Sequence, residues 1–249
     1  MKFWFTTAAV LVLGAAGLAQ TAAPVLNGGQ SQVQQEFRAS VEKLRPALLA
    51  VIALGNRGPV PVGTGFFVDA RGTFLTAAHV LDRQPGISGF RAYIPDTGSD
   101  HLLAFDILSL DPTRDFALCR LTSPTKGEPA PHFDFLTLEK NDPPAPGVMV
   151  AIAGFPLGGP KPVFQFGTVA AFADAGELLQ IGLMLNDGDS GGPVIEVGSG
   201  KLVGMAISIR TTALYEQSHP TIGQQNTGLS WVLPVNVVTS VLPAPMPSE

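Results

Sequence analysis

A serine enclosed by glycines is the strongest sign of chemistry in this sequence. Ser190 lies in the motif GDSGGP at residues 188–193, which follows one apolar segment and leads directly into another. Glycines allow backbone angles and close approaches that a side chain forbids, so such a turn can present the serine hydroxyl as a nucleophile. The backbone N–H groups of Gly188 and Ser190 can then point to one position and stabilise negative charge on an attacked carbonyl oxygen. The structural alternative is an ordinary glycine-rich hairpin turn.

A nucleophilic serine needs a base and a carboxylate that orients the base. His79 lies in TAAHV at residues 76–80, where two small alanines leave room around the imidazole. Asp115 lies in DPTRDFALCRL at residues 111–121, where a turn meets an apolar run. Taken alone, an aspartate here would cap the turn, and a single histidine on an apolar segment is usually structural. Together with Ser190 the two residues complete a catalytic set, with His79 as base and Asp115 as the orienting carboxylate.

The composition predicts a β-rich fold around these residues. The 249 residues are 45% hydrophobic and 14% charged, with 28 Gly and 22 Pro, which is typical of a large core joined by many tight turns. One amphipathic helix is predicted at residues 31–45, and short apolar runs of strand length follow it. The first six predicted strands are at residues 48–54, 63–69, 73–78, 91–94, 102–109 and 116–121. The second six are at residues 148–154, 163–172, 177–185, 193–197, 202–209 and 229–233.

Two sets of six short strands predict an all-β protein made of two closed, six-stranded antiparallel barrels, because closure removes exposed strand edges. The first barrel is expected at about residues 48–121 and the second at about 148–233, in one domain that spans residues 24–249. A polar, proline-rich stretch near residues 122–147 would connect them. Pro234 can start a short C-terminal helix, because proline is tolerated at the first helical position.

These motifs together resemble the trypsin-like peptidase family, which has the chymotrypsin double-barrel fold. His79, Asp115 and Ser190 follow that family's order along the chain. The segments GTGFFVDARGTFLTAAHV, IAGFPLG and GLSWVLPVNVV resemble the bacterial HtrA (Deg) branch in particular. The resemblance covers roughly residues 37–242 and implies a serine endopeptidase that hydrolyses polypeptides through an acyl-enzyme, without a cofactor. HtrA proteins normally carry a PDZ domain after the protease domain, whereas this sequence extends only a few residues beyond the resemblance, so we do not expect a chaperone.

Other functions on the same fold are less well supported by the sequence. A catalytically silent binding protein is the main alternative, because a fold alone does not guarantee activity, but such proteins usually lose one of the three catalytic residues. An esterase would use the same nucleophile, yet the order of the three residues does not favour it. Animal trypsins are activated by a freed N-terminus that pairs with the residue equivalent to Asp189. We do not expect that step, because a predicted helix separates VLNGG at residues 25–29 from the first strand.

Met184 is the expected determinant of substrate preference. It stands six residues before Ser190, where family members selective for Lys or Arg carry an aspartate. A thioether cannot compensate a buried cation, and the strands expected to line the pocket, at residues 177–185 and 202–209, are apolar. The resemblance therefore implies cleavage after small or medium aliphatic residues. The alternative is that residues 211–227 fold over the pocket and bring Glu216 close to it.

The first residues predict export. Residues 1–23 have the pattern of a signal peptide, with Lys2, an apolar stretch from Phe3 to Ala19 and small residues for cleavage. We expect an exported, periplasmic or secreted protein without stable membrane association after cleavage. An uncleaved anchor is the alternative, although the apolar run is slightly shorter than the ~20 residues that span a bilayer.

The remaining features indicate no further ligand. The net charge is −5 and no Lys/Arg cluster occurs, which argues against a nucleic-acid partner. His101, His132 and His219 are not spaced as ligands of one metal ion, so no metal or cofactor is expected. Cys119 is the only cysteine and lies in an apolar run, so we expect it to be buried and unpaired.

Overall fold

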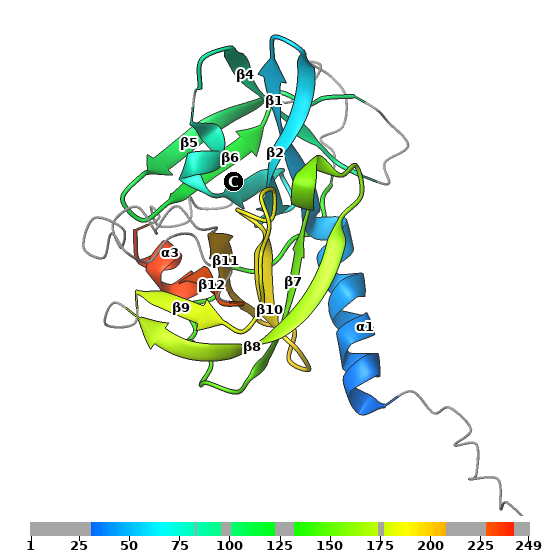
Figure 1. The fold of residues 1–249 in the computed structure, drawn as a ribbon, viewed down its shortest axis with the longest axis vertical. Coiled ribbons are helices and arrows are strands. Elements are labelled where there is room, and N and C mark those ends of the chain that lie inside the picture. The colour runs from blue at the N-terminus through cyan, green and yellow to red at the C-terminus, as the bar shows by residue number, and fades with distance from the viewer. Residues whose placement is uncertain are drawn as a thin grey trace, which may run out of the picture.

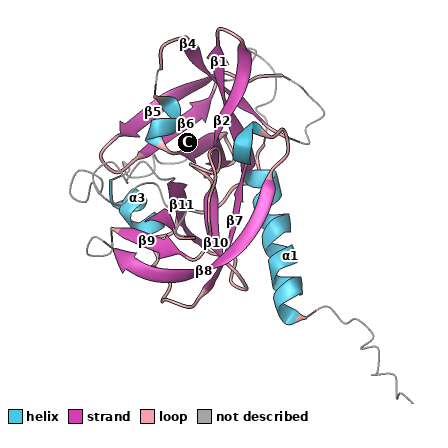
Figure 2. Ribbon diagram, in the orientation of Figure 1, coloured by secondary structure: helices cyan, strands magenta, loops and turns pink. Residues whose placement is uncertain are grey.

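The structure is a computed structural model that describes residues 31–82, 84–95, 101–122, 132–173, 177–207 and 228–241. The predicted signal peptide at residues 1–23 and the segment 211–227 with Glu216 lie outside the described residues. The described chain folds into two six-stranded antiparallel sheets, with a helix before the first strand and another after the last (Figures 1 and 2). This arrangement confirms the predicted chymotrypsin-like, all-β fold.

The first helix, α1 (Gln32–Leu44), has a complete N-terminal cap. The Gln34 N–H donates to Ser31 Oγ at 3.3 Å, and the Ser31 N–H donates to Gln34 Oε1 at 3.1 Å, so two backbone donors that the helix cannot pair are satisfied. Pro46 then turns the chain into the short 3₁₀ helix η1 (Arg45–Ala47). The helix packs on the outside of the second sheet, where the Phe37 and Phe166 ring centroids are 5.1 Å apart. The predicted helix at residues 31–45 is therefore confirmed.

The first sheet is six-stranded but is not a closed barrel in the described part of the chain. Its order is β4-β1-β2-β3-β6-β5, and a single bridge between Ala92 and Leu103 links its two ends. The expectation of two closed barrels is corrected to one barrel and one half-barrel. The strands are β1 (Leu48–Gly55), β2 (Gly58–Phe67), β3 (Thr73–Thr76), β4 (Ile87–Tyr93), β5 (Phe105–Asp111) and β6 (Phe116–Leu121).

The second sheet closes into a barrel in the order β10-β11-β12-β9-β8-β7. Its strands are β7 (Met149–Gly154), β8 (Val163–Ala173), β9 (Leu178–Ile181), β10 (Pro193–Glu196), β11 (Leu202–Ile207) and β12 (Ser230–Pro234). The helix α3 (Val235–Val241) follows β12 directly, as predicted from Pro234. Several predicted strand bounds are wrong in part. β4 begins at Ile87 and not at residue 91, and β5 spans Phe105–Asp111 and not residues 102–109. β9 ends at Ile181 and not at residue 185; beyond it the chain is irregular, and the Leu185 N–H donates to Ser230 Oγ.

The sheets are held by buried aromatic and aliphatic side chains. All four residues of β3 and all six of β11 are buried. Phe66, Phe67, Phe74 and Phe116 fill the first sheet, and the same cluster continues into the second sheet through residues such as Phe155. Cys119 is fully buried among these side chains, as expected, and burial raises the pKa of its thiol to about 12. The continuous core fixes the two sheets against each other.

Candidate active site

His79 and Asp115 make two hydrogen bonds to each other. His79 lies on the 3₁₀ helix η2 (Ala78–Leu81), just after β3. Its Nδ1 is 2.7 Å from Asp115 Oδ2, and its backbone N–H donates to Asp115 Oδ1 at 2.9 Å. Because an ionised carboxylate can only accept, this geometry suits an imidazole whose Nδ1 carries the proton, and in that neutral tautomer Nε2 is an acceptor. Both side chains are less than one fifth exposed, which keeps the pair partly out of water.

A different aspartate caps the turn before Asp115. Asp111 Oδ1 accepts the backbone N–H groups of Thr113 at 3.0 Å and Arg114 at 2.9 Å, and Arg114 Nη1 donates to Asp111 Oδ2 at 3.1 Å. These bonds, with the backbone bond from Arg114 as the largest cause, hold the Asp111 pKa below its ordinary value. Asp115 itself has a positive φ of 59°, a conformation that aspartate tolerates better than most residues. The turn is thus completed without Asp115, whose carboxylate is turned to His79.

Ser190 lies in a tight turn between the two sheets. Its carbonyl oxygen accepts the Thr64 N–H of β2 at 2.9 Å, and the next residue, Gly191, donates its N–H to Ala206 O of β11 at 2.8 Å. A Cβ on Gly191 would overlap Thr64 O and approach the Ala77 nitrogen to 2.9 Å. The turn therefore packs against the segment that leads into His79, and a side chain at position 191 would push it away.

Gly188 needs its glycine for both conformation and space. Its φ is 97°, and a Cβ there would overlap the carbonyl oxygen of Phe155. The segment after Phe155 is the 3₁₀ helix η3 (Pro156–Gly158), in which the Leu157 N–H donates to Asp187 O at 2.6 Å. The turn that carries Ser190 is thus supported from η3 as well as from β2.

Thr64 links the two sheets at this turn, and sequence reasoning missed it. Its hydroxyl donates to Gly188 O at 2.6 Å and accepts the Phe155 N–H at 3.0 Å, while its own carbonyl accepts the Thr76 hydroxyl at 2.7 Å. The side chain is fully buried. A threonine inside GTGFFVD reads as an ordinary strand residue, and only its contacts more than 90 positions along the chain reveal its role.

Asp189 is a fully buried carboxylate with one oxygen unpaired. Oδ2 accepts the Asn186 N–H at 2.9 Å, whereas Oδ1 has no hydrogen-bond partner among the described residues and lies against Gly154. Burial raises the pKa of Asp189, and the hydrogen bonds from Asn186 and Gln165 only partly oppose that effect. The carboxylate next to Ser190 is therefore poorly stabilised in its ionised form.

Met184 lies in the irregular segment between β9 and β10 and is 45% exposed. Its neighbour Leu185 is buried and bonded to Ser230, as described above. The side chain of Met184 therefore meets solvent beside an anchored neighbour, which leaves the thioether accessible to a ligand.

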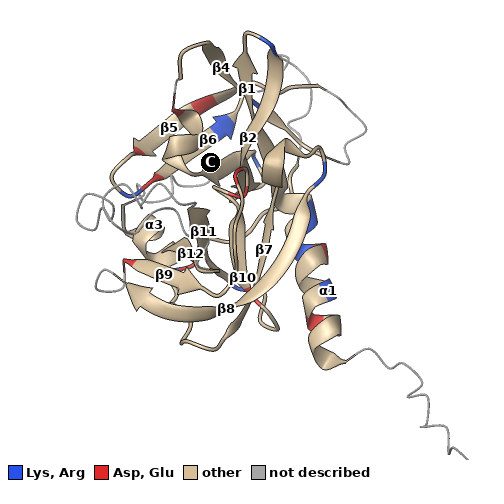
Figure 3. Cartoon of the chain, in the orientation of Figure 1, with Lys and Arg blue, Asp and Glu red and all other residues tan. Residues whose placement is uncertain are grey.

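The charge distribution offers no metal site or strongly charged face in the described residues. Acidic and basic residues are scattered along the ribbon, and α1 carries both signs (Figure 3). Nowhere in the described chain do three His, Cys, Asp or Glu side chains gather as metal ligands. Within the same residues, no helix has the length and apolar character needed to cross a bilayer.

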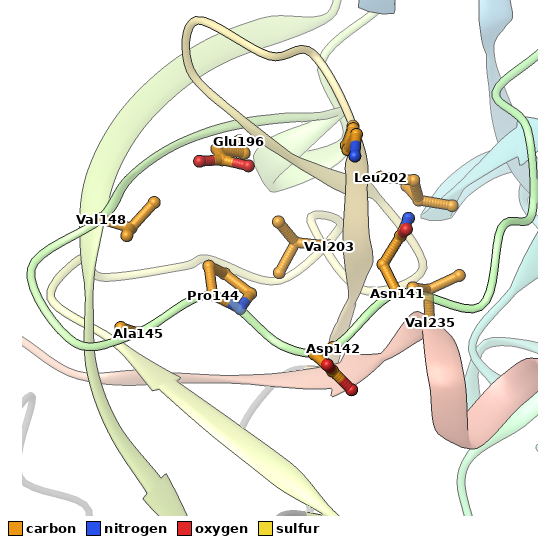
Figure 4. A pocket seen from close by; sticks show the side chains of 10 residues that line it. Asn141, Asp142, Pro144, Ala145, Val148, Glu196, Leu202, Val203 and Val235 are labelled. Atoms are coloured by element: carbon orange, nitrogen blue, oxygen red, sulfur yellow. The ribbon is translucent and has the colours of Figure 1, made fainter.

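A hollow of about 350 Å³ lies away from these residues, between the segment 141–148 and the strands β10 and β11 (Figure 4). It is lined by aliphatic side chains such as Val148, Leu202 and Val203 and by the charged residues Asp142, Glu196 and Lys201. His79, Asp115 and Ser190 do not line it, so its size does not make it the reaction site.

The chain is similar to known proteases in sequence and in fold. Residues 63–205 match the family described as the trypsin-like peptidase domain. The uncharacterized protein y4bJ of Sinorhizobium fredii is 32% identical over 155 residues, which are 59% of this chain but only 22% of that protein. A serine endoprotease from Yersinia pestis has a similar structure, with a TM-score of 0.62 and 18% identity, over 82% of this chain and 64% of that one.

The HtrA-type protease AlgW, solved with a tripeptide, is similar to the same degree, with a TM-score of 0.62 and 18% identity over 82% of this chain and 62% of that one. This chain thus spans less than two thirds of each of these proteins, and at 18% identity the likeness to the solved structures concerns the fold. The family match covers more than half of the sequence, including His79, Asp115 and Ser190. The chain therefore belongs to the trypsin-like peptidase family.

Proposed function

We propose that this protein is a serine endopeptidase that hydrolyses polypeptides through an acyl-enzyme intermediate, with His79, Asp115 and Ser190 as its catalytic residues. The observation that carries the proposal is the doubly hydrogen-bonded His79–Asp115 pair, whose chain segment packs against the turn of Ser190 at Ala77. Family membership and the likeness to proteins named as serine proteases support it.

The reaction follows from these groups. Ser190 Oγ attacks the scissile carbonyl carbon while His79 Nε2 takes its proton, and Asp115 stabilises the imidazolium that forms. The N–H groups of Gly188 and Ser190 donate hydrogen bonds to the carbonyl oxygen, on which negative charge develops. His79 then protonates the leaving amine, the C–N bond breaks and an ester to Ser190 remains. Water, deprotonated by His79, hydrolyses that ester and restores Ser190.

The test compares wild type with Ser190→Ala and His79→Ala on casein and on a fluorophosphonate that labels active serines. We expect wild type to cleave and to be labelled, and both variants to lose several orders of magnitude in activity while they stay folded. A Val33→Ala change on exposed α1 is the matched control and should behave as wild type. If folded wild type neither cleaves nor reacts, the proposal is wrong and a silent binding protein takes its place.

We further propose that cleavage follows small or medium aliphatic residues because Met184 lines the pocket for the residue before the cut. Its half-exposed thioether offers apolar contact worth ~25 cal/mol per Å² buried, and offers no counter-charge to a cation. In a peptide library, cleavage after Val, Ala, Leu, Ile or Met should dominate. Met184→Asp should depress that cleavage more than it depresses fluorophosphonate labelling. Val33→Asp, at 44% exposure, is the control, and dominant cleavage after Lys, Arg or Glu would contradict the assignment.

We also propose that the protein is exported, on the strength of the signal-like pattern of residues 1–23. In fractionated cells of the native host, the mature protein should lie outside the cytoplasm and begin between about residues 20 and 25. N-terminal sequencing checks this, and a retained Met1 in a membrane fraction would favour the uncleaved anchor.

A further inference from the structure

The hollow of about 350 Å³ between the segment 141–148 and the strands β10 and β11 is not used by the proposed reaction (Figure 4). Its volume lies at the lower end of the ~300–1,000 Å³ that is typical of small-ligand sites. Both charged and aliphatic side chains line it. The charged ones are Asp142, Glu196 and Lys201, and the aliphatic ones include Val148, Leu202, Val203 and Val235. A ligand that fills the hollow must therefore combine an apolar group with groups that pair with charge.

Lys201 provides the cation of this hollow. Its backbone is fixed, because the Glu196 N–H donates to Lys201 O and the Gly200 N–H donates to Glu196 O, both at 2.9 Å. The side chain is exposed, and its ammonium group has no hydrogen bond or ion pair within the part of the chain that the structure describes. A second hollow, of about 70 Å³, is lined by Lys201 and by Lys43, whose Nζ donates to Gly200 O at 2.7 Å. Two ammonium groups near Gly200 favour an anionic ligand group here.

Two carboxylates in the lining of the hollow can accept N–H groups. Glu196 Oε2 accepts the Ser199 hydroxyl at 2.8 Å, which leaves its other oxygen, and Asp142 has no hydrogen bond or ion pair among the described residues. Figure 4 shows the side chains of Glu196 and Asp142 on opposite sides of Val203. Because an ionised carboxylate accepts hydrogen bonds and donates none, these two groups suit a ligand that carries N–H donors as well as an anion.

We infer that this hollow binds the C-terminal end of a polypeptide, with the terminal carboxylate at Lys201, an aliphatic last side chain against Val148 and Val203, and peptide N–H groups donated to Asp142 or Glu196. A peptide end of this kind carries the anion, the apolar group and the N–H donors within one or two residues. A fatty acid has the carboxylate and the aliphatic chain but no N–H donor, so it would cover the two carboxylates without pairing them, which costs free energy. The site is separate from the catalytic residues, and its binding does not depend on the proposed peptidase function.

Isothermal titration calorimetry tests the inference with the peptide acetyl-alanyl-alanyl-leucine and the Ser190→Ala protein, which lacks the proposed nucleophile and leaves the peptide intact. The C-terminal amide of the same peptide removes only the anion, and octanoate keeps the anion and the aliphatic chain without an N–H donor. Lys201→Gln removes the cation, and Ala145→Trp fills the hollow from an exposed position in its lining. Lys140→Gln removes an exposed lysine that lines neither hollow and is the matched control for net charge.

We expect the free acid to bind at one site, and both the amide and Lys201→Gln to weaken binding by about tenfold or more, because a hydrogen bond between charged groups is lost. Ala145→Trp should abolish binding, whereas Lys140→Gln should bind as the parent protein does. Both lysines are exposed, so their variants should fold even if Ala145→Trp does not.

Equal affinity for the acid and the amide overturns the inference, as does unchanged affinity in Lys201→Gln or in folded Ala145→Trp, because the peptide would then bind elsewhere. Equal losses in Lys201→Gln and Lys140→Gln also overturn it, since general attraction to positive charge would explain the binding. Octanoate that binds as tightly as the peptide would assign the hollow to fatty acids and remove the peptide as its occupant. Absence of binding at millimolar peptide contradicts the inference outright.

Discussion

Asp115 accepts two hydrogen bonds from His79, one from the ring and one from the backbone, at 2.7 and 2.9 Å. The backbone bond fixes where the carboxylate sits, and the ring bond fixes which nitrogen of the imidazole carries the proton. An amide at this position can keep the first bond but not enforce the second.

Asp115→Asn should therefore lower kcat by about 10⁴-fold with little change in KM, because the imidazole is no longer held in the productive tautomer. Steady-state kinetics on a peptide substrate measures this. Thermal unfolding should show a folded protein. A loss below about tenfold would mean that Asp115 only positions the η2 backbone.

Asp189→Asn should change how stability depends on pH. Burial raises the Asp189 pKa above its ordinary value of 3.8, so the folded state keeps the proton to higher pH than the unfolded state. Ionisation of this group thus removes stability as the pH rises from about 3.8 to the raised folded pKa. The asparagine variant lacks that loss, so its free energy of unfolding relative to wild type should increase across this window. Urea unfolding at several pH values, in a Ser190→Ala background that prevents self-digestion, checks this. Parallel curves would contradict it.

Thr64→Val should cost stability and activity together. The methyl group keeps the shape but leaves the Phe155 N–H and Gly188 O without their partner, and each unsatisfied buried group costs about 1–3 kcal/mol. Because Gly188 carries a proposed oxyanion donor, kcat should fall more than 10-fold as well. Thr64→Ser retains the hydroxyl and is the control. If valine and serine behave alike in urea unfolding and kinetics, the hydroxyl has no such role.

Cys119 should be unreactive in the native state. Burial raises its pKa to about 12, and the thiolate is the reactive form, so a disulfide reagent at pH 8 should label the folded protein only as fast as it unfolds. In denaturant the single thiol should react at once. Rapid labelling of the folded protein would show that this part of the first sheet opens easily.

Strands made of an uninterrupted apolar run were predictable from the sequence. FALCRL became β6 with the predicted bounds, because Phe116, Ala117 and Cys119 are buried in the core and a turn precedes the strand. β2 was predicted to start at residue 63 but starts at Gly58. Pro59 and Pro61 concealed the first half of this strand in the sequence. They are tolerated because β3 pairs only with Gly65, Phe66 and Phe67, so within the described residues the earlier part of β2 has no strand partner on that side.

The candidate site was predictable where it has a local signature. The GDSGGP turn and the histidine of TAAHV can be recognised from neighbouring residues alone, and the structure lays the turn against the segment that leads into that histidine. Thr64, Leu157 and the unpaired oxygen of Asp189 could not be found in this way. Their importance arises from contacts between β2, η3 and the turn, which lie far apart along the chain and meet only after folding.

The hydroxyl of Thr64 lies at the boundary between the half-barrel and the barrel. The proposed catalytic residues are divided across the same boundary, with His79 and Asp115 on the half-barrel side and Ser190 on the barrel side. Catalytic turnover then requires that the half-barrel and the barrel are docked against each other, and not only that each is folded. Pressure or mild urea that separates the half-barrel from the barrel should abolish catalysis before the backbone amides of either sheet begin to exchange their hydrogens with solvent. The catalytic rate would then measure the fraction of molecules in which the half-barrel and the barrel are docked.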